Sequence, residues 1–120
     1  MTIGEMARRT GLTESKLRYY EKKGLIHVAR DGGGRRSYDE GDVEWVAFLC
    51  RLKETGMLLR DIRRYAQLRD RGRSTMPERL AMLETHRGYV AEQQRKWAGH
   101  LKKLEDKITF YQAEISHSET

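Results

Sequence analysis

The chain has 120 residues, of which 38% are hydrophobic and 35% charged, and its formal net charge is +6. This length allows one domain with an appended element and a modest core that needs no disulfide bonds. No apolar run approaches the roughly 20 residues that span a membrane, and no signal-peptide pattern opens the chain, so we expect a cytoplasmic protein. The single cysteine, Cys50, excludes an internal disulfide, and we expect no metal or other cofactor.

The positive charge is concentrated near the start of the chain. Residues 1–38 carry nine Lys or Arg against four Asp or Glu, whereas the remaining residues carry fifteen against fourteen. Clusters of Lys and Arg bind nucleic acid because they replace the counterions of its phosphates. A merely solvated basic surface would have the same composition, so charge alone decides nothing.

The first 24 residues have the pattern of a helix-turn-helix. Thr2 and Glu5 form a capping-box pattern at the start of one short helix, and Gly11 ends that helix. A second helix is expected over residues 14–23, with Gly24 as its end. Two short helices joined by a tight turn that contains glycine predict a helix-turn-helix.

The second helix has a cationic and aromatic outer face. When Leu17 is placed toward the core, steps of 100° per residue assign the outer positions. These are Ser15, Arg18, Tyr19 and Lys22, flanked by Lys16 and Tyr20. Such a face suits a major groove, where Arg, Lys and Tyr reach phosphates and Ser or Lys reaches base edges. Tyr20 is equally compatible with core packing, because amphipathic rings are often half buried.

Residues 26–40, IHVARDGGGRRSYDE, predict a β-hairpin with its tip at residues 32–34. Arg30, Arg35 and Arg36 lie on its arms, which is the pattern of a wing that grips the DNA backbone beside the groove. A glycine-rich phosphate loop is the competing interpretation. It lacks support because no strand-then-helix unit surrounds these glycines.

Two further helices and a linker follow. Asp39 is expected to cap a helix over residues 40–54, and a fourth helix is expected over residues 59–70. The predicted core positions are Val43, Val46, Ala47 and Cys50, with Trp45 and Leu49 as further candidates, then Leu59, Ile62, Tyr65, Ala66 and Leu68. RDRGRST reads as a polar, basic linker. We therefore expect a DNA-binding domain over residues 1–72, and a linker with a dimerisation helix over residues 73–120.

The C-terminal segment carries a heptad repeat. Its seam positions, alternately three and four residues apart, are Leu80, Leu83, Arg87, Val90, Gln94, Trp97, Leu101, Leu104, Ile108, Tyr111 and Ile115. Nine of these eleven residues are apolar or aromatic, and the repeat lasts five heptads, which is a specific signal for a coiled coil. A stripe this narrow needs a partner helix. A second copy of the chain is the simplest source, and the polar residues Arg87 and Gln94 would restrict the register.

Three stretches together resemble the MerR family of transcriptional regulators. TIGEMARRTGLTESKLRYYEKKGLI resembles the opening helix-turn-helix of that family, GRRSY its GYRxY wing, and DVEWVAFLCRLKETGM its third helix and following turn. The match covers residues 2 to about 70, and the last helix agrees in kind as a dimerising coiled coil. The resemblance implies a mainly α fold, in which a winged helix-turn-helix precedes a long C-terminal dimerisation helix that forms an antiparallel coiled coil.

The resemblance also implies a function and contact residues. A homodimer would bind a pseudo-palindromic promoter and, with an inducer, bend and untwist an overlong spacer so that RNA polymerase engages both promoter elements. By residue match, the contacts to DNA would come from Arg18 and Tyr20 in the second helix, from Arg30, Arg36 and Tyr38 in the wing, and from Lys53 in the third helix. Three departures stand out. Arg35 replaces a wing tyrosine and should alter wing contacts, whereas His27 in place of proline and Leu58 in place of a helix cap should only loosen local structure.

The sequence leaves the inducer open. DVEWVAFLCRLKETGM is most similar to the AdhR-type branch, whose members sense aldehydes or related electrophiles through one cysteine in this helix. That cysteine aligns with Arg51, one position after Cys50. Arg51 and Lys53 could lower the pKa of the Cys50 thiol toward a reactive thiolate, but burial as an inert core thiol is the favoured interpretation. The other candidate is an apolar small molecule bound among aromatic walls, for which the candidates are Trp45, Tyr65, Tyr89 and Trp97.

Two other classes of function compete with a regulator. No carboxylate pair, Ser-His-Asp set or phosphate loop has catalytic spacing, so we do not expect an enzyme. An architectural coiled-coil protein that binds DNA without sequence specificity would share the basic N-terminal region. It would not need the matched helix-turn-helix and wing.

Overall fold

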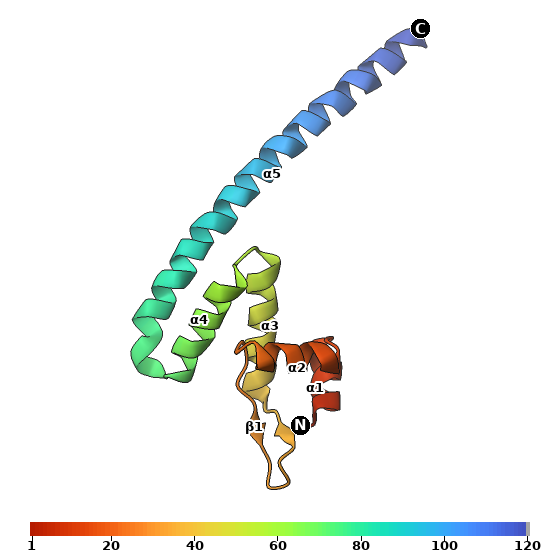
Figure 1. Cartoon of the computed structure of the whole chain (residues 1–120). Helices are drawn as coiled ribbons and strands as arrows, with labels where there is room; N and C mark the ends of the chain where they lie inside the picture. Colours follow the sequence, from red (N-terminus) through yellow and green to blue (C-terminus); the bar gives the residue numbers. More distant parts are fainter. Residues whose placement is uncertain (120) are drawn as a thin grey trace. The chain divides into compact units, whose positions relative to one another are not determined.

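Helices dominate the structure of the protein, a computed structural model that describes residues 1–119 (Figure 1). The elements in chain order are α1 (Ile3–Thr10), α2 (Glu14–Lys22), β1 (Ala29–Arg30), β2 (Arg36–Ser37), α3 (Glu40–Glu54), α4 (Leu59–Asp70), a 3-10 turn (Arg73–Thr75) and α5 (Met76–Ser118). The predicted mainly α architecture, with a two-stranded wing and a long C-terminal helix, is confirmed. None of the helices in the described part is both long and apolar enough to cross a membrane.

The chain forms two compact units, one over residues 1–83 and one from residue 84 onward. The first unit contains α1 to α4, the wing and the start of α5, whose Met82 and Leu83 pack against the core. The second unit is the rest of α5, and none of the described residues of α5 is buried.

Local signals set the ends of the first two helices where the sequence predicts them. The hydroxyl oxygens of Thr2 and Thr13 accept hydrogen bonds from backbone N–H groups in the first turns of α1 and α2, at 3.1 Å and 3.0 Å. Gly11 ends α1 with a φ of 75°, in the left-handed region where a side chain would be strained. Met6 of α1 and Leu17 of α2 are fully buried, so the two helices pack through their apolar faces.

The helix α3 has the predicted ends and, with two exceptions, the predicted core face. Asp39 and Asp42 form a reciprocal capping box at its start. Its buried residues are Trp45, Val46, Leu49 and Leu52. The prediction that Ala47 faces the core is wrong, since Ala47 is exposed and Leu52, which was not predicted, is buried. Leu52 takes the core position instead of Ala47 because burying a leucine removes far more apolar area from water than burying an alanine.

Trp45 is the centre of the core that joins α3 to α4. Its ring stacks on Tyr65 with centroids 5.5 Å apart and 7° between the planes, and its Nε1 donates a hydrogen bond of 2.9 Å to the carbonyl of Leu25. The guanidinium of Arg69 lies 5.0 Å from its ring centroid. In α4, Ile62, Tyr65, Ala66 and Leu68 are buried as predicted, whereas Leu59 is 40% exposed. Leu58 is the N-cap residue of this helix, and its side chain makes no capping hydrogen bond.

The segment predicted as a polar linker is partly built into the first unit. Thr75 is 3% exposed, and its hydroxyl lies 2.5 Å from the carbonyl oxygen of Leu68 and 2.8 Å from that of Gly72. Arg79 donates to the same hydroxyl from the first turns of α5. The segment is therefore a short 3-10 connection tied to α4, which polar composition alone did not predict.

Candidate nucleic-acid interface

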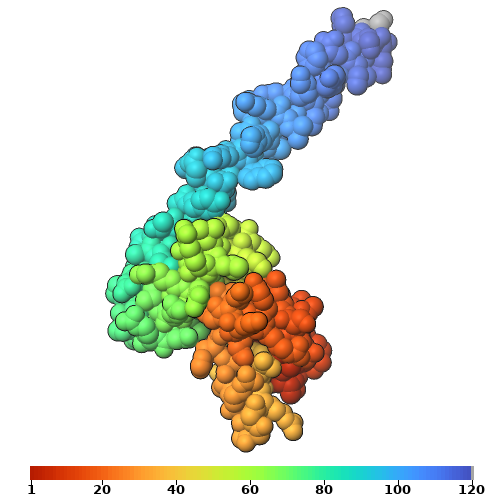
Figure 2. Space-filling view, in the orientation of Figure 1, coloured from red at the N-terminus to blue at the C-terminus, as the bar shows by residue number. Residues whose placement is uncertain are grey.

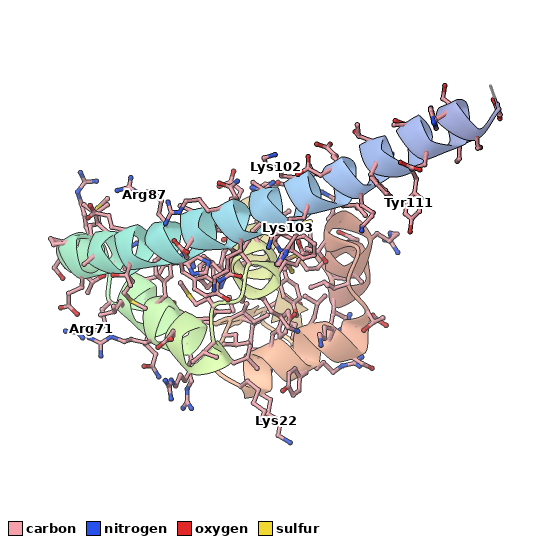
Figure 3. The ribbon with its side chains drawn as sticks, turned by 90° about the horizontal axis from the view of Figure 1, so that it is seen from above. Lys22, Arg71, Arg87, Lys102, Lys103 and Tyr111 are labelled. Atoms are coloured by element: carbon pink, nitrogen blue, oxygen red, sulfur yellow. The ribbon has the colours of Figure 1, made fainter. Side chains whose placement is uncertain are left out.

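The outer face of α2 is exposed as the helical phase predicts. Ser15, Arg18, Tyr19 and Lys22 are exposed, while Leu17 and Tyr20 face inward. Figure 3 shows the Lys22 side chain extending away from α2 into open space. The face therefore presents cations and one aromatic ring on a rigid helix. Its contact with DNA stays a prediction.

Tyr20 joins two cationic side chains from different helices. Its ring is 2% exposed, so the open question of its burial is answered in favour of the core. The Nζ atoms of Lys16 on α2 and Lys53 on α3 lie 5.5 Å and 5.6 Å from its ring centroid, within range of cation–π attraction. Lys53 Nζ also lies 3.5 Å from the phenol oxygen. Burial raises the pKa of Tyr20, so the phenol stays neutral and its ring interacts with the two cations through its face and its hydroxyl oxygen.

The wing is a two-residue antiparallel ladder with a hydrogen-bonded tip. Ala29 pairs with Ser37, and Arg30 pairs directly with Arg36. At the tip, the Asp31 carboxylate accepts hydrogen bonds of 2.9 Å and 3.0 Å from the backbone N–H groups of Gly33 and Arg35. Figure 2 shows the hairpin projecting from the helices of the first unit. The tip and the exposed Arg35 are thus placed where they could meet a DNA backbone.

The Glu21 carboxylate forms ion pairs with both arginines of the wing ladder. Sequence analysis did not predict this role for Glu21. Arg30 Nη2 lies 3.0 Å from Glu21 Oε1, and Arg36 Nε lies 3.3 Å from Glu21 Oε2. Glu21 is on α2, next to Tyr20, and its side chain is 22% exposed. The partners are 9 and 15 residues apart, so only the tertiary fold brings them together. Residues 16–36 contain two acids, Glu21 and Asp31, among seven Lys and Arg, and no local pattern marks Glu21 as the partner of both wing arginines.

Tyr38, predicted from the resemblance to act from the wing, lies in the core. It is 3% exposed, and its phenol oxygen is buried with no hydrogen-bond partner among the described residues. Burial raises its pKa, so the phenol stays neutral. Its contact with DNA stays a prediction, and its ring is by position a packing element beneath the wing.

Cys50 is half-buried and packs against the core. Burial raises the pKa of its thiol, and Glu54 acts in the same direction, while Lys53 and Lys16 oppose them. Lys53 thus acts in the direction that a reactive thiolate would need, but the net shift is upward because desolvation of the thiolate outweighs the attraction of the cations. Among the described residues, no three His, Cys, Asp or Glu side chains gather as a metal site would require.

The four aromatic residues considered as walls of a small-molecule site fall into two groups. Trp45 and Tyr65 stack on each other in the core, so their faces are occupied. Tyr89 and Trp97 belong to the second unit, where they are 47% and 73% exposed. The structure therefore gives Trp45 and Tyr65 a packing role.

Comparison with known proteins identifies relatives that match most of the chain. The family described as "MerR HTH family regulatory protein" matches residues 1–69, and "MerR, DNA binding" matches residues 43–108. An HTH-type transcriptional regulator of Haemophilus influenzae is 38% identical over 112 residues, which cover 92% of this chain and 83% of that protein. The HTH-type transcriptional regulator AdhR of Bacillus subtilis is 36% identical over 93 residues, covering 77% of this chain and 66% of AdhR.

Solved structures agree with these matches. A crystal structure of HiNmlR, described as a MerR family regulator lacking the sensor domain and bound to promoter DNA, is similar with a TM-score of 0.82 and 38% identity. The similarity covers 92% of this chain and 89% of that chain. A putative MerR family transcriptional regulator from Listeria monocytogenes has a TM-score of 0.86 and 26% identity, over 92% of this chain and 85% of that chain.

Proposed function

Because the chain belongs to the MerR family of helix-turn-helix regulatory proteins, we propose that it is a sequence-specific transcriptional regulator that binds promoter DNA as a homodimer. The observation that carries the proposal is the exposed cationic face of α2 beside the arginine-bearing wing, both in the first compact unit. A relative of similar length that lacks a sensor domain is described as bound to promoter DNA, which supports the same use here.

In the proposed complex, α2 lies in the major groove and the wing lies on the backbone beside it. Arg18 and Lys22 reach phosphates or base edges from α2, and Ser15 is short enough to meet a base edge directly. Lys16 and Lys53, which flank the Tyr20 ring, would meet a phosphate together. The wing adds Arg30, Arg35 and Arg36.

The exposed stripe of α5 supports the dimer. Its large apolar side chains include Leu80, Trp97, Leu101, Leu104, Ile108, Tyr111 and Ile115, all between 48% and 73% exposed. Figure 3 shows Tyr111 extending away from the helix. A contiguous apolar stripe of this kind marks an interaction surface, and its heptad spacing fits a helix of the same sequence. The partner helix of a second copy, running antiparallel, would cover it.

The dimer would act by reshaping promoter DNA. Two copies of α2 related by a two-fold axis read two half-sites, so the operator is a pseudo-palindrome. Bending and untwisting of the spacer on inducer binding would let RNA polymerase engage both promoter elements, at an energy cost that depends on the spacer sequence. The alternative, an architectural protein without sequence preference, uses the same charge but gives no role to the matched wing and α2 face.

A footprint in the presence of excess bulk DNA tests the proposal. The protein and DNA from upstream of its own gene are mixed with a large excess of unrelated duplex, and cleavage protection is mapped. We expect discrete protection of a palindromic segment, because specific binding exceeds non-specific binding by orders of magnitude. Uniform coating that the competitor removes would contradict the proposal and favour the architectural alternative.

Arg18→Ala should weaken binding to all DNA sequences to a similar degree. Loss of one phosphate contact removes one released counterion, so the slope of log affinity against log salt should fall by about one. Titrations of specific and unrelated duplexes over a range of salt concentrations check this. If affinity falls only for operators with one particular base pair, Arg18 is a base reader instead.

Cys50→Ser should lower the free energy of unfolding by about 1 to 2 kcal/mol and leave regulation intact, since a hydroxyl would be buried in a largely apolar place. Because burial raises the pKa of the thiol, thiol-reactive probes should label the native protein slowly at neutral pH. Transcription assays with an aldehyde or oxidant should give the same response for both forms. Fast labelling together with lost induction in the serine variant would make Cys50 the sensor.

A further inference from the structure

We propose that Glu21 of α2 is a positioning residue that fixes Arg30 and Arg36 of the wing relative to α2 and thereby sets how strongly the protein prefers its operator over other DNA. The effect on operator preference rests on the proposed function. The fixing of the wing arginines by Glu21 rests on the structure of the free chain alone.

The wing ladder places two like charges opposite each other, and Glu21 offsets their repulsion. Arg30 and Arg36 are direct partners across the two antiparallel strands, and like charges in directly opposite positions destabilise a strand pair. The ladder has only two residues on each side, so backbone pairing contributes little to hold it together. A single carboxylate with one oxygen on each guanidinium offsets the repulsion and ties both strands to α2.

The bridge is more sheltered than the other ion pairs of the first unit. The side chains of Glu21 and Arg36 are 22% and 27% exposed, and Arg30, at 46%, is the more open member; in the pair between Arg9 and Glu40, which joins α1 to α3, the carboxylate itself is 71% exposed. Charge-assisted hydrogen bonds that are partly shielded from water hold geometry better than exposed pairs, whose contribution is small. Glu21 is therefore placed to determine where the wing arginines point.

Orientation and charge both connect Glu21 to specificity. Wing contacts to phosphates set the register of the whole domain on the duplex, and that register decides whether α2 meets its bases. The carboxylate also repels phosphates and partly neutralises the two arginines, which lowers affinity for DNA of any sequence. Loss of the carboxylate should thus loosen the wing and raise non-specific binding together.

Glu21→Gln is the sharpest test, because glutamine keeps the shape but removes the charge and replaces one carboxylate oxygen by an NH2 donor, so one of the two guanidinium groups loses its acceptor. Glu40→Gln is the matched control, since it also removes one negative charge from an arginine pair that joins two elements, here α1 and α3, and leaves Arg30 and Arg36 with their carboxylate. The probes are a duplex selected by the wild-type full-length protein from a randomised pool and a scrambled duplex of equal composition. Affinities are compared at one fixed salt concentration, and amide hydrogen exchange of the wing is followed without DNA.

We expect Glu21→Gln to reduce the ratio of affinities for selected and scrambled duplex by about tenfold, the scale of one lost base-pair contact. In the free protein, its wing amides should exchange faster than those of Glu40→Gln. Arg36→Gln should also speed the exchange of the wing amides, and the double variant should be less than additive in this exchange, because both residues act through one interaction.

The inference is overturned if Glu21→Gln has the same sequence preference and the same wing exchange as Glu40→Gln. A different failure belongs to the proposed function, namely a wild-type protein that selects no preferred duplex. In that case faster wing exchange in Glu21→Gln would still support the positioning role, and unchanged exchange would refute it.

Discussion

Replacing both Leu101 and Leu104 by glutamate is expected to turn the dimer into a monomer that no longer binds palindromic DNA. The two side chains are 54% and 60% exposed in the single chain, so the substitution changes no buried residue of the described fold. In the dimer, however, each chain would place two carboxylates in a desolvated seam, which costs several kcal/mol or more in total. Sedimentation at micromolar concentration, with gel shifts of a palindromic duplex, measures both effects.

A control variant separates the seam from general effects of charge. Thr85→Glu combined with Ala113→Glu adds the same charge at exposed positions on the side of α5 opposite the seam. This variant should sediment as a dimer and bind DNA normally. The heptad interpretation is wrong if the Leu101 and Leu104 variant stays dimeric at micromolar concentration.

The helices and their ends were predictable because their signals are local. Asp39 with Asp42, and Thr13 before α2, cap N–H groups within three residues of themselves, and Gly11 ends α1 through its own backbone conformation. Such interactions depend little on the rest of the fold. The same reason explains why the outer face of α2 was placed correctly once Leu17 was assigned to the core.

Features that depend on packing between elements were not predictable. The buried face of α3 was assigned by helical period, which cannot tell whether Ala47 or Leu52 lies nearer the core centre, whereas the tertiary fit of Trp45 against Tyr65 decides it. Thr75 looked like part of a polar linker because its hydroxyl is polar, and only the nearby carbonyl of Leu68 makes its burial favourable.

In the candidate interface, too, the features set by local sequence were predictable and those set by packing between elements were not. Charge and helical period identified most of its cations, since each lies on a predicted outer face or hairpin arm. The Glu21 bridge needed the wing to fold back onto α2, a contact between segments whose proximity no local pattern encodes. The burial of Tyr20 was open for a related reason, because a ring at the edge of a helical face can turn either way until α3 is in place.

Trp45→Ala is expected to cause the largest loss of stability of any single substitution proposed for this protein, about 3 to 5 kcal/mol. The change would empty the space under Tyr65, remove the ring beneath Arg69 and leave the carbonyl of Leu25 without its donor. Leu25 follows the turn that ends α2, so the helix proposed to enter the groove would lose one of its anchors. Urea unfolding at fixed protein concentration measures the loss, and DNA affinity should fall with it.

Two control variants separate the contribution of the stacked ring from that of the Nε1 hydrogen bond and from any general effect of substitution in α3. Trp45→Phe keeps an aromatic ring against Tyr65 but removes Nε1, so it should cost about 1 to 3 kcal/mol, mainly for the unpaired buried carbonyl of Leu25. Glu44→Ala, at an exposed neighbouring position of α3, should change stability by no more than about 0.5 kcal/mol. If Trp45→Ala cost no more than Trp45→Phe, the stacked ring would contribute nothing beyond its hydrogen bond. The core that positions α2 would then have to be anchored elsewhere, through the fully buried Met6, Leu17 and Leu49.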